Sequence, residues 1–228
     1  MDSVIGIAVT SFLVGLSGAM MPGPVLSVTI GETVARVRAA EPGQGEGPGR
    51  PQLRAALAGP LVVLGHGLLE IALVVAVLLG LGTLLTRTPV VGAVGLLGGA
   101  VLLWMGWGML ASLSTLRLDT AAADRRMHPV LAGILTSLSN PYWALWWATV
   151  GLSYIALSLR LGWVGLTFFY VGHILSDLAW YSAVSLALAM GRRLITDRTY
   201  RGLVTACAVF LVGFGLYVGY AGARLLLA

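Results

Sequence analysis

Two stretches of the sequence share one pattern, Gly65-His66-Gly67-Leu68-Leu69-Glu70 and Gly172-His173-Ile174-Leu175-Ser176-Asp177. Each holds a glycine, a histidine and an acidic residue in the same order and at the same spacing. Each also lies inside a long apolar run, where ionisable side chains are rare and usually functional. Self-similarity of this kind indicates an internal repeat.

Apolar runs make up most of the chain. Of its 228 residues, 58% are hydrophobic and 10% are charged, whereas a soluble domain has about a quarter charged residues. A membrane-spanning helix needs about 20 apolar residues, so this length accommodates six such helices and their connections, without a separate soluble domain. The gaps between charges place the spans at about Val4–Ile30, Leu57–Leu85, Pro89–Leu113, Val130–Leu159, Leu161–Met190 and Leu203–Leu227.

The six predicted spans divide into two halves of three, at about residues 4–116 and 128–228. Span three contains Trp104-Met105-Gly106-Trp107 where span six contains Tyr217-Val218-Gly219-Tyr220. Because each half has an odd number of spans, the second half must cross the membrane in the opposite orientation to the first. The sequence therefore predicts an all-α integral membrane protein, a single membrane domain over residues 1–228 built from two inverted three-helix repeats. Such repeats are characteristic of secondary transporters.

The placement of arginine orients these spans. All 14 basic residues are arginines, and the first, third and fifth connections hold all but Arg87, Arg160 and Arg224. Connections rich in arginine stay on the cytoplasmic side, so both termini are expected on the other side of a plasma (inner) membrane. The first connection, at about residues 32–54, is rich in proline and glycine and is expected to be a flexible cytoplasmic loop. Lipid headgroups explain the net charge of +5 better than nucleic acid does.

Proline interrupts the first and fourth spans, at Pro22-Gly23-Pro24 and at Asn140-Pro141-Tyr142. At 1.5 Å per residue, both breaks lie about 15 Å from the predicted cytoplasmic ends of their spans, near the bilayer centre. Each break starts a half-helix whose free amides and partial positive charge can hold a carboxylate. These six residues are therefore candidates for substrate binding, with a packing kink as the alternative.

Two acids and two histidines lie well inside predicted spans. His66 precedes Glu70 by four residues and His173 precedes Asp177 by four, a spacing that puts each pair on one helix face. The pairs are candidates for proton coupling or for binding a substrate amino group. A satisfied polar pair nearer the membrane surface is the alternative.

Glycines spaced by four residues, Gly95-x-x-x-Gly99 and Gly215-x-x-x-Gly219, allow close helix packing. They are expected to join the two halves or two subunits, in the second case as a homodimer. Cys207 is alone, so no disulfide framework is expected.

These features together resemble the lysine exporter (LysE/RhtB) family of amino-acid efflux proteins, and the resemblance covers the whole chain. That family typically has Pro-Gly-Pro in its first span, as at residues 22–24, and Asn-Pro-Lys in its fourth, as at Asn140 and Pro141. Here Tyr142 stands where the family usually has lysine, so any role of that lysine is lost or replaced.

The resemblance implies a secondary exporter of amino acids or related small zwitterions or cations. Proton-motive force is the expected energy source, because the chain has no nucleotide-binding P-loop. The alternative is a divalent-metal exporter whose metal meets the His/acid pairs of spans two and five. An enzyme is not expected, since there is no nucleophile elbow and no cysteine pair. No cofactor and no resident metal are expected.

Overall fold

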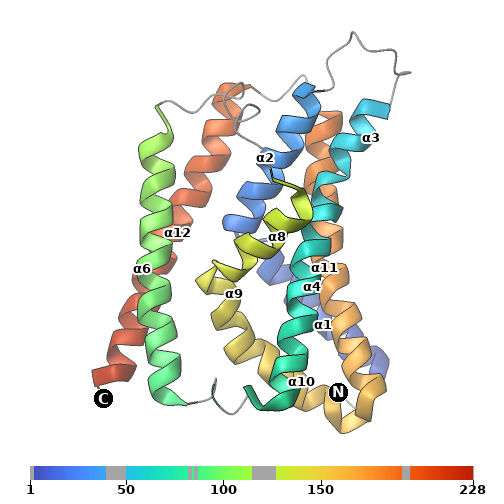
Figure 1. Ribbon diagram of the computed structural model, residues 1–228, viewed down its shortest axis with the longest axis vertical. Helices are drawn as coiled ribbons and strands as arrows, with labels where there is room; N and C mark the ends of the chain where they lie inside the picture. Colours follow the sequence, from blue (N-terminus) through green and yellow to red (C-terminus); the bar gives the residue numbers. More distant parts are fainter. Residues whose placement is uncertain are drawn as a thin grey trace.

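The computed structural model describes residues 3–39, 50–81, 84, 87–114, 127–191 and 196–227. These residues form helices and no strand, which confirms the all-α prediction for this part of the chain. Figure 1 shows that the longest helices run roughly along one common direction, with both chain termini at the same end of the molecule. The elements are α1 Val4–Ala19, α2 Pro24–Ala39, α3 Arg50–Ala56, α4 Ala58–Ala76, η1 Val77–Leu81, α6 Thr88–Ser112, α8 Pro129–Leu138, α9 Pro141–Trp146, η2 Trp147–Gly151, α10 Leu152–Ser158, η3 Leu159–Leu161, α11 Gly162–Met190 and α12 Asp197–Leu227.

Four helical segments of the described residues are long and apolar enough to cross a membrane: Gln52–Leu81, Thr88–Ser112, Pro141–Met190 and Val204–Leu227. A fifth candidate is the pair Val4–Ala19 and Pro24–Val37, bent by 74° at its break. The segment from Pro141 to Met190 is not one straight rod, because the chain reverses direction between α10 and α11 (Figure 1). Gly162 permits this turn with a φ of +67°, a conformation that favours glycine.

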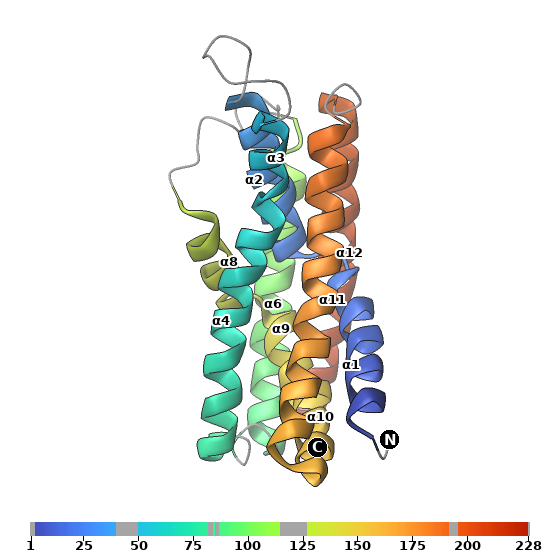
Figure 2. The ribbon, with the colours of Figure 1, turned by 90° about the vertical axis from the view of Figure 1, so that its right-hand side faces the viewer.

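Both predicted helix breaks are present. The first falls between α1 and α2, so that Pro24 opens α2 at a position where a missing N–H costs nothing. The second falls between α8 and α9, where Asn140 caps α9 and Pro141 opens it. Figure 2 shows α1 in the lower part of the molecule and α2 in the upper part, as the bend requires.

The predicted loop at residues 32–54 is shorter than expected. Residues 32–39 belong to α2, because they include alanine, valine and arginine and no helix breaker, and residues 50–54 belong to α3, where Pro51 stands in the first turn and is tolerated. Arg36 Nη1 donates to the backbone carbonyl of Arg54 at 3.2 Å, which ties the two helices together. The Pro/Gly-rich centre of this connection lies outside the described residues. So do five of the predicted cytoplasmic arginines, Arg117, Arg125, Arg126, Arg192 and Arg193.

The glycine faces of α6 and α12 pack against each other within the chain. A Cβ added to Gly99 would lie 2.6 Å from the Cα of Gly219, and one added to Gly95 would lie 3.0 Å from the Cα of Gly222. Backbone therefore contacts backbone along this pair, as small residues allow. The prediction that these faces join parts of one chain is confirmed, and the alternative of a dimer through them has no support.

The other main contacts bring each broken helix against a long helix. On α1, Ser11 donates its hydroxyl to the carbonyl of Phe169 in α11 at 3.0 Å, and Gly172 packs against the carbonyl of Ala8. On α8, Val130 places its carbonyl against Gly65 of α4. Small residues thus seat the α1 half-helix on α11 and the α8 half-helix on α4.

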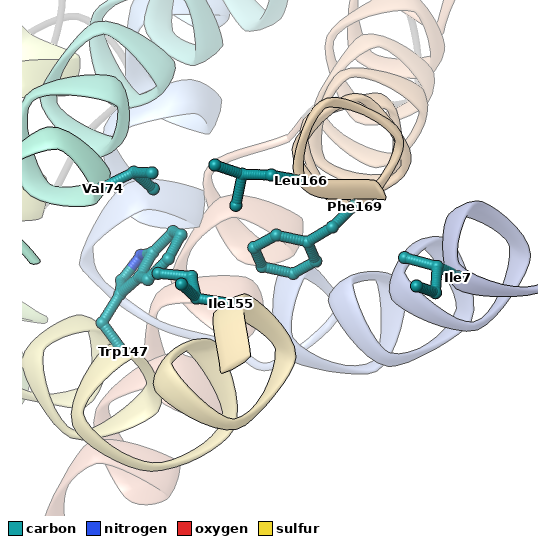
Figure 3. Close-up of a cluster of buried hydrophobic side chains, with 6 residues drawn as sticks. All are labelled: Ile7, Val74, Trp147, Ile155, Leu166 and Phe169. Atoms are coloured by element: carbon teal, nitrogen blue, oxygen red, sulfur yellow. The ribbon is translucent and has the colours of Figure 1, made fainter. Parts of the chain in front are cut away.

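A buried apolar cluster lies where five of these elements meet. Figure 3 shows its members, which come from α1, α4, η2, α10 and α11: Ile7, Val74, Trp147, Ile155, Leu166 and Phe169. The Trp147 side chain is 1% exposed, and its ring meets Phe169 edge-on at 6.2 Å between centroids. This cluster fixes the second half of the fourth span against the helices that carry the acids.

Candidate functional site

A pocket opens between the two helix breaks, with about 620 Å³ of empty space when its open side is included. Nine of the ten residues that the sequence singled out line it: Pro22, Gly23, Pro24, His66, Glu70, Asn140, Tyr142, His173 and Asp177. The tenth, Pro141, is buried but does not line the pocket, because its ring packs against Gly98 of α6. The structure therefore brings both predicted groups of residues to one place.

The two His/acid pairs form one cluster across α4 and α11. His66 Nε2 lies 3.0 Å from Glu70 Oε1 and 3.6 Å from Asp177 Oδ2. His173 Nε2 lies 3.2 Å from Glu70 Oε1 and 3.8 Å from Asp177 Oδ2. Each histidine thus faces both acids. Both acids are buried, with Glu70 1% and Asp177 4% exposed.

The two oxygens of Glu70 have very different surroundings. Oε1 accepts indole N–H bonds from Trp143 at 3.2 Å and from Trp147 at 2.9 Å, in addition to the two histidine contacts. Oε2 is buried and has no hydrogen-bond partner, and the same holds for Asp177 Oδ2. Buried polar atoms are normally satisfied, so two acceptor oxygens at a pocket wall indicate a place for a ligand that brings donors.

The two histidines differ in the same way. Ser137 on α8 lies 2.6 Å from His66 Nδ1 through its hydroxyl, so both ring nitrogens of His66 have partners. His173 Nδ1 is buried without a partner. Aromatic rings hold His173 instead, with Trp146 stacked on it at 4.6 Å and 24° and Trp147 edge-on at 5.6 Å.

The breaks contribute less backbone to the pocket than the sequence suggested. At the start of α9, the side-chain oxygen of Asn140 accepts from the Tyr142 amide at 3.1 Å, and proline at 141 has no N–H to offer. That amide is therefore already used. At the start of α2, the backbone carbonyl of Gly23 accepts a hydrogen bond from the amide of Ser27 at 3.0 Å. The amides of Val25 and Leu26 lie in the first turn, where the helix itself supplies no acceptor.

Aromatic side chains from α9 and α12 line the pocket opposite the His/acid cluster. Tyr142 meets Phe214 edge-on at 5.3 Å, and Phe214 stacks on Phe210 at 5.6 Å and 8°. Sequence reasoning missed Phe210 and Phe214, along with Ser137, Tyr181, Gly15 and Gly18. For the phenylalanines a signal existed, because they stand four residues apart on the sixth span, but apolar aromatic pairs are common on any buried face.

Three of the site's residues have the geometry to hold a metal ion. One ligand atom each from His66, Glu70 and Asp177 lies within 4.8 Å of the others. The donor set of one imidazole and two carboxylates suits a divalent transition metal. Several of these atoms already have partners, however, since N–H donors surround Glu70 Oε1 and His66 is held at both nitrogens.

Comparison with known proteins places this fold and site in a family. The chain matches the LysE type translocators over residues 53–222, which is about three quarters of its length and includes Glu70, Asn140, Tyr142, His173 and Asp177. No curated protein and no solved structure matches it. These translocators are membrane transporters and not enzymes, in agreement with the apolar helices around a buried pocket. The chain therefore belongs to the LysE type translocator family, and it is a multi-pass membrane protein that transports small molecules.

Proposed function

We propose that this chain is a secondary exporter that moves amino acids out of the cytoplasm, driven by the proton-motive force. The observation that carries the proposal is the pair of unpartnered carboxylate oxygens, Glu70 Oε2 and Asp177 Oδ2, in a pocket bordered by both helix breaks. A substrate ammonium brings three N–H donors and a positive charge. It would satisfy both oxygens and offset the cost of two buried acids.

A proton and an ammonium group compete for the same two acids. When the ammonium leaves, a proton neutralises one carboxylate and lowers the cost of the empty pocket. This exchange at one site is the simplest form of antiport, and the two histidines beside the acids supply further places for the proton. The lack of a nucleotide-binding motif in the sequence supports the proton-motive force as the energy source.

The proposal includes six spans in two inverted halves, with both termini outside the cytoplasm. The paired contacts support it: α1 rests on α11 through Ala8 and Gly172, while α8 rests on α4 through Val130 and Gly65. Gly65 and Gly172 are equivalent in the sequence repeat, and each first half-helix thus packs on the middle helix of the other half. The α6–α12 pair relates the two third helices in the same way. The arginine bias supports the orientation in a plasma membrane.

A divalent-metal exporter is the second candidate, because His66, Glu70 and Asp177 can converge on one ion. The existing hydrogen bonds disfavour it. A metal at His66 would need a free ring nitrogen, and His66 has Ser137 at Nδ1 and Glu70 at Nε2. A metal would also have to displace the indole N–H groups from Glu70 Oε1.

Efflux from proteoliposomes tests these functions directly. Vesicles containing the purified chain are loaded with the twenty L-amino acids in one set and with Zn²⁺, Mn²⁺ and Ni²⁺ in another, and efflux is followed with and without a proton gradient. We expect gradient-dependent efflux of amino acids and none of metals. Metal efflux alone would replace the first function with the second.

The acids have their own test. We expect Glu70→Gln and Asp177→Asn each to abolish the effect of the proton gradient on efflux. Tyr217→Phe, on an exposed part of α12, is the control. Amino-acid efflux that both acid variants leave unchanged contradicts the proposed role of the acids.

A further inference from the structure

Two glycines on α1 leave a notch in the wall of the pocket. A Cβ added to Gly18 would lie 3.4 Å from both Trp146 Nε1 and Tyr142 Oη. One added to Gly15 would lie 2.8 Å from His173 Nδ1 and would overlap the hydroxyl of Ser176. The missing side chains thus let polar atoms lie close to α1, Trp146 Nε1 and Tyr142 Oη beside Gly18 and His173 Nδ1 beside Gly15. We call this part of the pocket wall, at Gly15 and Gly18, the α1 notch.

The polar atoms around the α1 notch lack partners. His173 Nδ1 is buried and makes no hydrogen bond, although the residue is 5% exposed. Within the described residues, the Trp146 indole N–H and the Tyr142 hydroxyl also make no hydrogen bond, and both side chains line the pocket. Packing alone does not explain why these polar atoms have no partner, because buried polar groups are normally hydrogen-bonded.

The position on α8 that corresponds to Gly15 on α1 carries a side chain, that of Ser137. Residues 15–17 read Gly-Leu-Ser and residues 137–139 read Ser-Leu-Ser, on the two half-helices that pack on α11 and α4. Ser137 fills its position with a hydroxyl bound to His66 Nδ1 at 2.6 Å. At Gly15 that hydroxyl is missing, and His173 Nδ1 has no equivalent partner, because α1 and the Ser176 hydroxyl close over it. The room for a ligand lies beside Gly18, which lines the pocket and where an added Cβ would meet no atom closer than 3.4 Å.

The groups in the α1 notch are suited to an oxyanion. The indole N–H of Trp146 is a donor only, and the Tyr142 hydroxyl can donate. Trp146 Nε1 and Tyr142 Oη both lie 3.4 Å from the position of a Cβ on Gly18, and all three residues line the pocket. The two oxygens of one carboxylate in the pocket beside Gly18 can therefore reach both donors. The acids Glu70 and Asp177 approach His173 through Nε2, at the far edge of its ring.

We propose that the α1 notch binds the carboxylate of the transported amino acid beside Gly18, through Trp146 and Tyr142, while Glu70 and Asp177 bind its ammonium. This subsite rests on the proposed amino-acid export. It gives the Tyr142 hydroxyl, which makes no other hydrogen bond among the described residues, a role as a donor to the carboxylate. It also explains why α1 has glycine at position 18, although alanine would fit there at ordinary contact distance.

The experiment compares carboxylates with neutral amides. Proteoliposomes are loaded with an equimolar mixture of the twenty L-amino acids or with the mixture of the corresponding L-amino-acid amides, which keep the ammonium and side chain but lack the carboxylate. Efflux of each compound is followed by mass spectrometry for the wild-type chain, Tyr142→Phe and Gly18→Ala. Tyr217→Phe and Gly108→Ala are matched controls, because Tyr217 is 70% exposed and nothing lies near Gly108.

Loss of one hydrogen bond to a carboxylate lowers affinity about tenfold to hundredfold. We therefore expect Tyr142→Phe and Gly18→Ala to raise the KM for amino acids by about tenfold or more, with less than about a twofold change for any amides that are exported. Equal effects on acids and amides, or no effect on either, overturn the carboxylate subsite. A wild-type chain that exports neither mixture contradicts amino-acid export itself, so the two failures are distinct.

Discussion

The α6–α12 pair and the pocket between α4 and α11 are built on opposite principles. Along α6 and α12, glycines such as Gly99 and Gly219 bring backbone against backbone with no ionisable group between them. In the pocket, Glu70, His173 and Asp177 are buried with polar atoms that nothing satisfies. Every contact between α6 and α12 adds to the stability of the fold. The unsatisfied polar atoms of the pocket lower that stability until a ligand binds to them. A region that stays incomplete inside an otherwise well-packed chain is where transport is expected.

The largest expected effect breaks the packed region. Gly99→Val places branched carbons where a single Cβ already lies 2.6 Å from the backbone of Gly219. Overpacking costs about 1–3 kcal/mol or more where backbone cannot move, so we expect little folded protein. Fluorescence-detected size exclusion measures this. Gly108→Val on the same helix should leave the yield unchanged, and an equal loss from both would show that the contact of Gly99 with Gly219 is not the cause.

A large effect on transport, without loss of folding, is expected in the pocket. Glu70→Gln keeps an acceptor for the indole N–H groups of Trp143 and Trp147 but removes the negative charge. We expect efflux to fall about a hundredfold, the equivalent of about 2.7 kcal/mol in binding or in the barrier. The thermal unfolding midpoint should change little, because the glutamine oxygen still accepts from the indole N–H groups and both histidines can become neutral. A midpoint several degrees lower would make Glu70 a structural residue.

A smaller effect separates the two histidines. Ser137→Ala leaves His66 Nδ1 buried without its partner, which costs about 1–3 kcal/mol of stability. Efflux should change only a few-fold, since Ser137 does not line the pocket. Thermal unfolding and efflux of the same preparation provide the comparison. A loss of transport without a loss of stability would place Ser137 in the transport cycle.

The smallest effect is expected from Trp147→Phe. A phenyl ring stays in the apolar cluster of Figure 3, while the N–H bond to Glu70 and part of the buried ring volume are lost. Because Trp143, His66 and His173 still contact the same oxygen, we expect a loss of about 1 kcal/mol in stability. Urea or thermal unfolding in detergent detects it. A much larger loss would mean that this one indole positions Glu70 by itself.

The sequence predicted the features that follow from composition and repetition. Buried acids such as Glu70 and proline breaks such as Pro22-Gly23-Pro24 are rare enough in apolar helices to stand out. The sequence predicts a loop from about residue 32, whereas α2 continues to Ala39. The arginines after Glu32 are good helix formers, and the helix therefore extends through them. The partner of Gly99 stayed open, because the same small-residue spacing serves contacts within and between chains.

The remaining site residues could not be found from the sequence, for a physical reason. Phe210 on α12 and Gly18 on α1 lie far apart along the chain and have no unusual residue type for a membrane helix. Their roles depend on which neighbour fills or leaves the space beside them. In the sequence, Tyr142 differs from the expected motif but has no assigned role. In the structure, its hydroxyl lies beside Trp146 and Gly18 at the pocket wall.

Glu70 Oε1 has a mechanical consequence for any motion between the halves. The oxygen belongs to α4, while three of its four nitrogen contacts, from Trp143, Trp147 and His173, come from residues beyond 128. Displacing α4 against α9, η2 and α11 stretches all three contacts together. Part of the resistance to such a motion therefore lies at one atom, and a proton or ammonium arriving on the same carboxylate weakens that part from within the pocket.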